Sequence, residues 1–453
     1  MNRIIEFIKN KYHFFFIAAI VFFRGFYLLN GWGLGHMAAD SGSYLYADLH
    51  ISRLGRRVPL YPLFLKICRR MVHWDETAAC AVAAALQCLL SLAVLYFLYQ
   101  VLLAVTKNRL LSYITLLFYG SNVAILNWDS AIMTESLTLD MIILFLYVVI
   151  RYLEKKTVFL GSLAVLLSVA ASMIKPTCAV LTGVCLVMVV LQFITMKDMR
   201  KKLIRISAVI ALAIVFYLAY CANTYKNYGT FNLTQLGPRH NLVTCLVTGT
   251  YKNYPDKDLV AQIDRILEED RAAGKNIKRY PTTGRVMRLF SDDERERNIL
   301  VAQFNKYCAK SDPMAHIMFK LDNIVKYWGV AYENRDWQLW DYAVEYNGFE
   351  RLVYKLQKYV FSSVHIWFCF IMLAISIVMT AILWVRRKAI PWHWLGMSGT
   401  ILILLFAVYN NAYASFYRHT LFVLPCAYVS AAMFVSHILG LITGKKRDAA
   451  ASE

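Results

Sequence analysis

Charged residues are scarce in this sequence. They make up 17% of its 453 residues, against about 25% in an average soluble domain, whereas 59% are hydrophobic, against roughly 45–50%. This shortage excludes an ordinary soluble protein, and the high apolar content excludes a disordered chain. The composition therefore predicts a polytopic membrane protein.

Acidic residues are scarcer than basic ones. The chain has 29 Asp and Glu against 49 Lys and Arg, which gives a formal net charge of +20. In a soluble protein this excess would indicate nucleic acid or an acidic surface as partner, but in a membrane protein Lys and Arg first determine orientation. Their positions along the chain decide between the two interpretations.

Cysteine motifs and a cleavable signal are also lacking. The ten cysteines form no C-x-x-C pair, which argues against a zinc ribbon or a secreted disulfide framework. Cys245 and Cys308 fall in a predicted external segment, where they could form a disulfide or remain thiols. The first apolar stretch contains Arg24 and no small-residue cleavage site follows it, so we expect a retained first helix.

Long apolar stretches are what the sequence has in abundance. A helix of roughly 20 residues crosses the apolar layer of about 30 Å, because lipid offers no partners for backbone groups. The predicted fold class is an all-α polytopic membrane protein with about ten transmembrane helices. An even number of spans places both chain termini on the same side of the membrane. The ten stretches cover residues 12–30, 78–105, 110–127, 133–153, 157–174, 177–196, 204–222, 360–385, 393–411 and 416–440.

Short basic clusters precede the first stretch and follow alternate stretches. All of them fall on one face if the helices alternate in direction, and the positive-inside rule makes this face cytoplasmic. We therefore expect a plasma-membrane protein with both termini in the cytoplasm and no nucleic-acid partner. The clusters are Arg3, Lys9 and Lys11, then Lys107 and Arg109, Lys155 and Lys156, Lys197 to Arg205, Arg386 to Lys388, and Lys445 to Arg447.

Two predicted external segments, residues 31–77 and 223–359, are too long to be turns, so we expect the function there. They divide the chain into an N-terminal transmembrane module (1–222) with about seven helices, an external and mainly helical insert (223–359), and the C-terminal transmembrane helices with a short basic tail (360–453).

Shorter helices are predicted inside both external segments. In the first, the run from Tyr44 to about Arg53 is expected to lie along the membrane interface. In the insert, helices are predicted over 256–271, from a capping box at 291–294 to about 309, and over 313–328.

Three carboxylates are predicted at the external face. Asp40 follows the glycines of the first external segment, and Asp129 and Glu135 flank the connection between the third and fourth stretches. Such a group can position a hydroxyl substrate or bind a hard cation such as Mg²⁺ or Mn²⁺. Alternatively, Asp40 is a solvated charge or a helix N-cap, and Thr134 caps the fourth helix while Glu135 complements its dipole.

Arg24 and Asp140 fall at least six residues inside predicted spans. Arg24 and Asp140 share a depth of roughly 10 Å below the external face, at 1.5 Å of rise per residue. Charges inside membranes are usually paired, so an ion pair joining the first and fourth helices is expected, with a structural role ahead of a catalytic one.

Several short motifs occur in a characteristic order. After the Arg in the first helix come Asp40-Ser41-x-x-Tyr44 and Arg57-x-Pro59-x-Tyr61-Pro62, then Thr134-Glu135-Ser136, Lys175-Pro176-Thr177, Asp312-Pro313-Met314, and Tyr417-Arg418 ahead of Pro425. In this order and topology the chain resembles membrane glycosyltransferases of the GT-C superfamily. Within that superfamily it resembles the protein mannosyltransferase and aminoarabinose transferase branch, or the bacterial transferases grouped with them.

The resemblance implies a function. Such enzymes transfer a sugar from a polyprenyl-phosphate donor to an acceptor hydroxyl or amine of a glycan, lipid or protein on the non-cytoplasmic side, with inversion. By resemblance, Asp40 corresponds to the catalytic carboxylate of the first loop, and a carboxylate there can act as a base. The resemblance leaves the need for a cofactor open: the carboxylates could bind a divalent metal, and several members of this class work without one.

A lipid phosphate would also need positive charge where its negative charge accumulates. Lys175 and Arg418 are the preferred residues, because both lie where a span meets the external face; snorkelling to the headgroups is the alternative. The expected substrate-binding residues are Asp129, Glu135, Tyr44, Arg57, Tyr61, Lys175, Arg239 and Arg418, with Arg56 and Arg335 as further cations.

A lipid or substrate transporter, or a flippase, is the alternative class, and an inactive binding protein is a third. Transporters commonly have repeated halves and a site at the bilayer midplane. Here seven stretches precede the insert and three follow it, and the ionisable residues gather at one face. This asymmetry favours an enzyme at the membrane surface.

Overall fold

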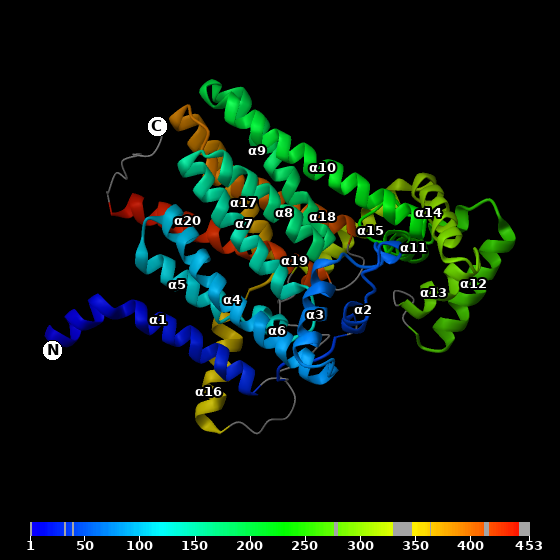
Figure 1. Ribbon diagram of the computed structural model, residues 1–453, viewed down its shortest axis with the longest axis horizontal. Helices are drawn as coiled ribbons and strands as arrows, with labels where there is room; N and C mark the ends of the chain where they lie inside the picture. Colours follow the sequence, from blue (N-terminus) through cyan, green and yellow to red (C-terminus); the bar gives the residue numbers. More distant parts are fainter. Residues whose placement is uncertain are drawn as a thin grey trace.

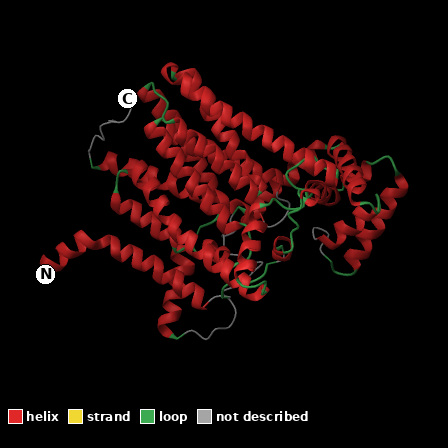
Figure 2. Ribbon diagram, viewed as in Figure 1, coloured by secondary structure: helices red, strands yellow, loops and turns green. Residues whose placement is uncertain are grey.

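The computed structural model describes residues 2–30, 33–38, 40–275, 280–328, 347–362, 364–411 and 416–443. In these ranges the chain is helical, with no β-strand beyond an isolated parallel bridge between His36 and Ala131 (Figure 2). Long helices run side by side, and the helices of the insert lie at one end of them (Figure 1).

Eight helical segments in the described ranges are long and apolar enough to span a membrane. They are α1 (Asn2–Asn30), α4 (Glu76–Thr106), α7 (Glu135–Lys155), α9 (Val180–Thr195) with the preceding η2 (Pro176–Ala179), α10 (Arg200–Tyr228), α17 (Ile366–Arg387), α18 (Trp392–Asn411), and α20 (Leu424–Ile442) with the preceding α19 (Phe416–Thr420) and η7 (Leu421–Val423).

The other two predicted stretches are also helical but differ from simple spans. α5 (Arg109–Gly120) and α6 (Val123–Ser130) count as a ninth span only if the pair, bent by 53°, is taken as one. α8 (Val158–Ile174) is apolar but shorter. The structure therefore confirms a helical multi-pass membrane protein, while the count of ten spans stays a prediction.

The bend between α5 and α6 has a local cause. The first helix ends at Gly120 with Ser121 as its C-cap, and Asn122 caps the second, because its side chain accepts a hydrogen bond from the backbone N–H of Ala124 at 2.9 Å. Its amide nitrogen donates to the hydroxyl of Tyr428 at 3.3 Å, which fixes the bend against α20. The break redirects the residues that follow it, including Asp129.

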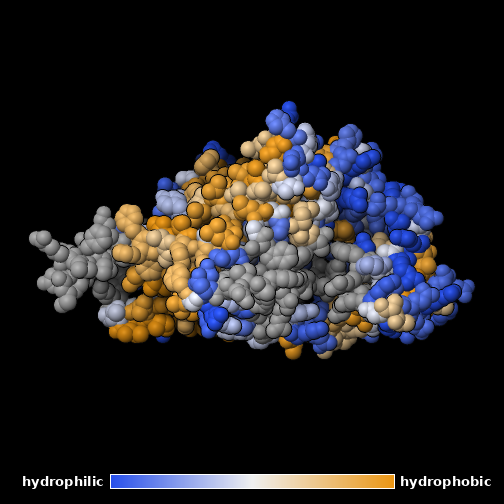
Figure 3. Space-filling model, turned by 90° about the horizontal axis from the view of Figure 1, so that it is seen from below, coloured by the Kyte–Doolittle hydropathy of each residue, from blue (hydrophilic) through white to orange (hydrophobic). Residues whose placement is uncertain are grey.

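The hydrophobic core runs through the spans, and α7 is at its centre, with α4 and α8 packed along it. Apolar surface gathers over the bundle, whereas hydrophilic surface covers the end formed by the insert (Figure 3). The start of α1, the α4–α5 and α9–α10 connections and the end of α20 lie at the opposite end (Figure 1). This end carries the predicted cytoplasmic clusters from Arg3 to Lys388, and we refer to it as the basic end; Lys445 to Arg447 lie outside the described residues.

The insert has a hydrophobic core of its own. α11 (Gly237–Thr248), η4 (Thr250–Asn253), α12 (Lys257–Ala272), α13 (Tyr280–Arg288) and α14 (Glu294–Ser311) enclose buried side chains that include Leu242, Ile263, Val301 and Phe304. α15 (Pro313–Tyr327) follows outside this core. α16 (Gly348–Leu356) and η6 (Gln357–Phe361) instead pack against α1, through Val353 and Phe361 on Phe23 and Phe26.

α10 carries the chain from the spans into the insert. Its 29 residues extend about 44 Å, so it is longer than the apolar layer of about 30 Å. It ends at Gly229, which has a φ of +71°. An ideal Cβ at this position would lie only 2.5 Å from the carbonyl oxygen of Arg295, so only glycine fits. The predicted domain boundary at 222/223 therefore lies inside a continuous helix.

Two local predictions need correction. The prediction of a helix from Tyr44 to Arg53 is wrong, because α2 (Ser41–Leu45) ends at Leu45 and the next helical turn is η1 (Ile51–Arg53). Between them the carboxylate of Asp48 accepts a hydrogen bond from the N–H of His50 at 2.9 Å, and this local turn replaces helical hydrogen bonding. The amphipathic helix of this segment is α3 (Leu60–Met71).

In the insert, the helix start expected at Ser291 lies two residues later. Asp293 is the N-cap of α14, because its carboxylate accepts the N–H of Glu296 at 2.7 Å. The predicted helices at 256–271 and 313–328 are observed as α12 and α15.

Candidate functional site

The loop before Asp40 is held against the connection between α6 and α7. The N–H of Gly35 donates to the carbonyl of Ser130 at 2.9 Å, and the N–H of Ile132 donates to the carbonyl of His36 at 3.1 Å. The hydroxyl of Ser41 adds a bond of 2.7 Å to the carbonyl of Ile132. These contacts place the predicted first-loop carboxylate beside the start of α7.

Gly35 allows this close approach. Its φ is +84°, and an ideal Cβ at this position would lie 2.6 Å from the carbonyl carbon of Cys80 in α4. A side chain would therefore strain the backbone and also collide with α4.

Asp40 lies between two guanidinium groups. Its Oδ1 is 3.1 Å from Nη2 of Arg57, and its Oδ2 is 3.5 Å from Nη2 of Arg418. Although Asp40 immediately precedes α2, its side chain makes no capping hydrogen bond. The side chain is 22% exposed, so the carboxylate is paired and still accessible.

Glu135 is fully buried and lies beside the same arginine. Its Oε1 is 2.8 Å from Nζ of Lys175 and 3.3 Å from Nε of Arg418, and the hydroxyl of Thr134 donates to Oε2 at 3.2 Å. The hydroxyl of Thr134 makes no capping bond to α7. Glu135 therefore does more than complement a helix dipole: it joins residues that are distant in sequence.

We call Asp40, Arg57, Glu135, Lys175 and Arg418 the Asp40 cluster. Its three cations face two carboxylates, which leaves one formal positive charge. Opposite charges at these distances stabilise each other, but the excess remains available to an anion.

Aromatic rings support the cations of the Asp40 cluster. The guanidinium of Arg57 lies 4.4 Å from the ring centre of Tyr44, and Nζ of Lys175 lies 4.2 Å from that of Phe422. The guanidinium of Arg418 is 6.0 Å from the ring of Trp128. Such contacts hold cations in place without neutralising them.

The two predicted tyrosines have different positions. Tyr44 accepts a hydrogen bond from Nη1 of Arg57 at 3.3 Å, so it belongs to the wall of the cluster. Tyr61 is completely buried, donates to Gln87 at 2.9 Å and packs edge-on against Tyr44. Burial raises the pKa of both phenols, so both stay protonated at neutral pH. Tyr61 positions Tyr44 instead of facing a ligand.

Asp129 lies in a separate buried cluster. Its Oδ2 is 3.1 Å from Nη1 of Arg24, and its Oδ1 accepts from the hydroxyl of Ser136 at 2.6 Å. Both oxygens are thus engaged, and the side chain is buried. The bend between α5 and α6 turns Asp129 toward α1, away from the Asp40 cluster where we expected it.

The ion pair predicted between Arg24 and Asp140 is replaced by this one. Besides Asp129, Arg24 donates from Nε to the carbonyl of Gly120 at 3.0 Å and from Nη1 to the hydroxyl of Ser91 at 3.2 Å. Asp140 is also buried, but its Oδ2 has no hydrogen-bond partner in the part of the chain that the structure describes. Asp140 interacts with Arg24 only electrostatically. The angular position of Asp129 follows from the bend between α5 and α6, which the sequence pattern does not indicate.

The start of α11 faces the Asp40 cluster. Nε of Arg239 donates to the hydroxyl of Thr283 at 3.4 Å, so this residue is tied to the insert. Next to it, His240 interacts electrostatically with Arg57, Arg239, Asp40 and Arg418. Burial, and then the neighbouring arginines, lower the pKa of His240 to about 4, so the imidazole is neutral at pH 7.

Sequence reasoning missed His240. Its signal was weak, since it is one histidine beside Arg239 in a polar segment, and only the packing of α11 brings it to the cluster. Of the other cations considered, Arg56 is exposed, and Arg335 lies outside the described residues.

Among the described residues, no group of three or more His, Cys, Asp or Glu side chains could hold a metal ion. Cys245 and Cys308 are buried free thiols in the core of the insert, and Sγ of Cys245 donates to Asn305 at 3.5 Å.

The fold and its apolar helices define a multi-pass helical membrane protein. No protein-family model, curated protein or solved structure matches the chain. Its particular activity must therefore be argued from the Asp40 cluster.

Proposed function

We propose that the protein is an integral membrane glycosyltransferase of the GT-C type. It would transfer a sugar from a polyprenyl-phosphate donor to an acceptor hydroxyl or amine at the external face of the plasma membrane. The observation that carries the proposal is the position of Asp40 between Arg57 and Arg418, at the end of the spans that faces the insert. The order of the short motifs supports it.

The cations suit the phosphate of such a donor. When the bond between the sugar and the phosphate breaks, negative charge accumulates on the phosphate, and fixed cations stabilise it. Arg57 and Arg418 can each bind two phosphate oxygens, whereas Lys175 acts as a point charge. The excess positive charge of the Asp40 cluster favours binding of an anionic donor.

Asp40 suits the role of the base. In an inverting transfer, the acceptor oxygen or nitrogen attacks the anomeric carbon from the face opposite the phosphate, and the acceptor proton passes to a carboxylate. Asp40 is partly exposed, whereas Glu135 is fully buried and bound to Lys175. Asp40 is therefore the carboxylate that an acceptor can reach, and Glu135 is the residue that positions Lys175 and Arg418.

The test replaces Asp40 by Asn. We expect the purified Asp40→Asn protein in proteoliposomes to bind the donor and to lose transfer by roughly 10²–10⁴-fold, the usual contribution of a general base. The donors would be polyprenyl phosphates carrying mannose or aminoarabinose, and the measurements would be sugar transfer and donor binding.

Asp48→Asn is the matched control, because Asp48 lies in the same external segment and forms an exposed ion pair with Arg53. This variant should transfer at the wild-type rate. Transfer by Asp40→Asn within a few-fold of wild type would rule out Asp40 as the base.

A further inference from the structure

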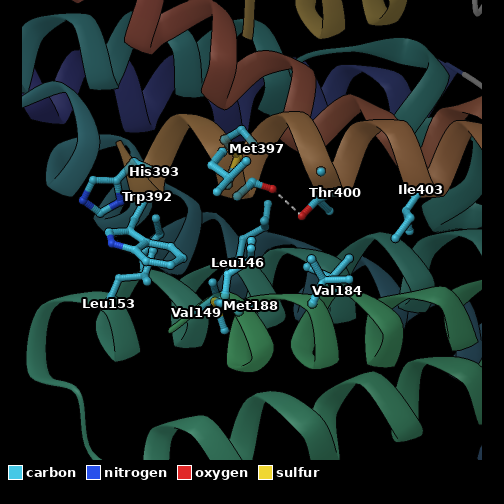
Figure 4. A pocket seen from close by; sticks show the side chains of 16 residues that line it. Leu146, Val149, Leu153, Val184, Met188, Trp392, His393, Met397, Thr400 and Ile403 are labelled. Carbon is cyan, nitrogen blue, oxygen red and sulfur yellow. Dashed lines mark hydrogen bonds between the residues drawn. The ribbon is translucent and has the colours of Figure 1, made fainter. Parts of the chain in front are cut away.

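A second candidate site lies far from the Asp40 cluster. A pocket of about 90 Å³ lies between α7, α9 and α18. This volume is several times the roughly 10–15 Å³ that one water needs, so the pocket is larger than a packing defect. Figure 4 shows Leu146 and Val149, Val184 and Met188, and Ile403 around this space.

The lining of the pocket is apolar. Only Trp392, His393 and Thr400 have side chains with a nitrogen or oxygen atom, and the hydroxyl of Thr400 already donates to the carbonyl of Gly396 in its own helix at 2.7 Å. Water would therefore find few partners there, whereas hydrocarbon would fit.

Glycines on α18 keep the space open. An ideal Cβ on Gly396 or Gly399 would meet no atom within 4 Å, although both residues line the pocket. Val187, on the opposite wall, is 52% exposed, so the pocket is continuous with the outer surface of the bundle. All three helices are candidate spans, and this outer surface lies at the depth of the bilayer.

The pocket begins close to the basic end. Along α7, Leu153 and Leu146 precede Lys155 by two and nine residues, which places them about 3 Å and about 14 Å from that end. Leu146 is also eleven residues from Glu135, or about 16 Å from the Asp40 cluster. The pocket thus extends from the basic end to about the middle of the spans, and its opening for a lipid headgroup is at the basic end.

A polar group lies at the shallow end. Trp392 and His393 begin α18 and lie together at one end of the pocket (Figure 4). Nδ1 of His393 is buried without a hydrogen-bond partner in the described ranges, and the imidazole interacts electrostatically with Lys107 and Glu154. An aromatic ring, an imidazole and a lysine at this level suit the interface of a lipid leaflet.

We propose that this pocket binds one acyl chain of a glycerophospholipid from the leaflet at the basic end, with the lipid phosphate or ester oxygens facing His393. The acyl chain fills the space beside Gly396 and Gly399 and contacts α7, α9 and α18. The site is independent of the proposed transfer reaction, because the cluster at which a donor phosphate would bind is at the other end of α7.

The test compares two glycine variants in the full-length protein. Gly396→Leu fills the pocket. Gly183→Leu is the control: an added Cβ at Gly183 also meets no atom within 4 Å, but Gly183 lies on α9 outside the pocket lining. Native mass spectrometry would count retained phospholipid, and thermal unfolding would be measured with and without dioleoyl phosphatidylglycerol.

Wild type and Gly183→Leu should retain one phospholipid and gain thermal stability when the lipid is added. Gly396→Leu should lose the lipid-bound peak and this gain. Gly399→Leu replaces Gly396→Leu if the latter does not fold. If a folded pocket-filling variant retains as much phospholipid as wild type, the pocket is not the binding site. If the protein selectively retains added undecaprenyl phosphate in place of phospholipid, the proposed class of lipid is wrong.

Discussion

Arg418 contacts both carboxylates of the Asp40 cluster, and its planar guanidinium makes this possible. Nη2 lies 3.5 Å from Asp40, while Nε lies 3.3 Å from Glu135. Lysine would keep the charge but present a single point of contact. Arg418→Lys should therefore weaken donor binding roughly 10–100-fold, the equivalent of one or two charge-assisted hydrogen bonds. Titration of donor into proteoliposomes measures this.

Arg53→Lys is the control for Arg418→Lys, because Arg53 pairs with Asp48 at an exposed position. Its donor affinity should stay at the wild-type level. Equal affinity of Arg418→Lys and wild type would show that the donor phosphate does not use the guanidinium.

Arg24 and Asp129 form the buried ion pair of the spans. Removing one partner leaves the other charge unpaired in an apolar region, so Arg24→Met should destabilise the protein by about 3–5 kcal/mol. The double variant Arg24→Met with Asp129→Leu should recover most of this loss. Thermal or denaturant unfolding in detergent would measure both.

Arg151→Ala serves as the comparison for the buried pair. Arg151 pairs with Glu154 at 2.9 Å in a partly exposed position, where such pairs contribute about 0–1 kcal/mol. If Arg24→Met costs no more than Arg151→Ala, the buried pair does not stabilise the spans.

At the scale of elements, the loop from Gly33 to Asp40 positions the carboxylate. Gly33 and Gly35 both have positive φ, at +76° and +84°, but only Gly35 lies against α4. Gly33→Ala should cost about 1–2 kcal/mol, the penalty of a left-handed conformation. Gly35→Ala should lower the free energy of unfolding by more than Gly33→Ala and should also displace Asp40. Sugar transfer by the folded protein should therefore fall in Gly35→Ala and not in Gly33→Ala. Parallel transfer and unfolding assays would show the difference.

α11 makes the stability of the molecule depend on pH through His240. The unfolded imidazole binds a proton below about pH 6.5, whereas in the folded protein its pKa is about 4. The unfolded state therefore binds more protons between these values, and stability should fall as the pH drops from about 6.5 to about 4. Above pH 6.5 this contribution is constant.

The pH effect can be assigned by substitution. His240→Gln should flatten the acid side of a plot of melting temperature against pH, and His36, whose pKa burial also lowers to about 4, should account for part of the remaining slope. An unchanged slope in His240→Gln would show that α11 does not bury this imidazole.

At the scale of the whole molecule, the sequence predicts the apolar helices well and the site in part. Hydropathy is local, so all ten predicted stretches contain apolar helices, and the short motifs identify Asp40, Glu135, Lys175 and Arg418 as neighbours. The partner of Arg24 depends on the bend at Asn122, which no local pattern indicated. His240 reaches the cluster only through the packing of α11.

The predicted orientation has a direct test. Because the basic clusters in the described part of the chain lie at the end opposite α11 to α14 of the insert, alkaline phosphatase fused after residue 107 should be inactive, and after residue 235 it should be active. Fusions of a cytoplasmic reporter should give the reverse pattern. The opposite result would place the Asp40 cluster in the cytoplasm.

The position of Arg418 late in the chain has a consequence for biosynthesis. Asp40, Arg57, Glu135 and Lys175 all belong to the segment that is translated before the insert, and among themselves two carboxylates balance two cations. The excess positive charge arises only when α19 is inserted. A partly synthesised chain would thus hold a neutral cluster, and affinity for an anion would appear only after the last helices have entered the membrane.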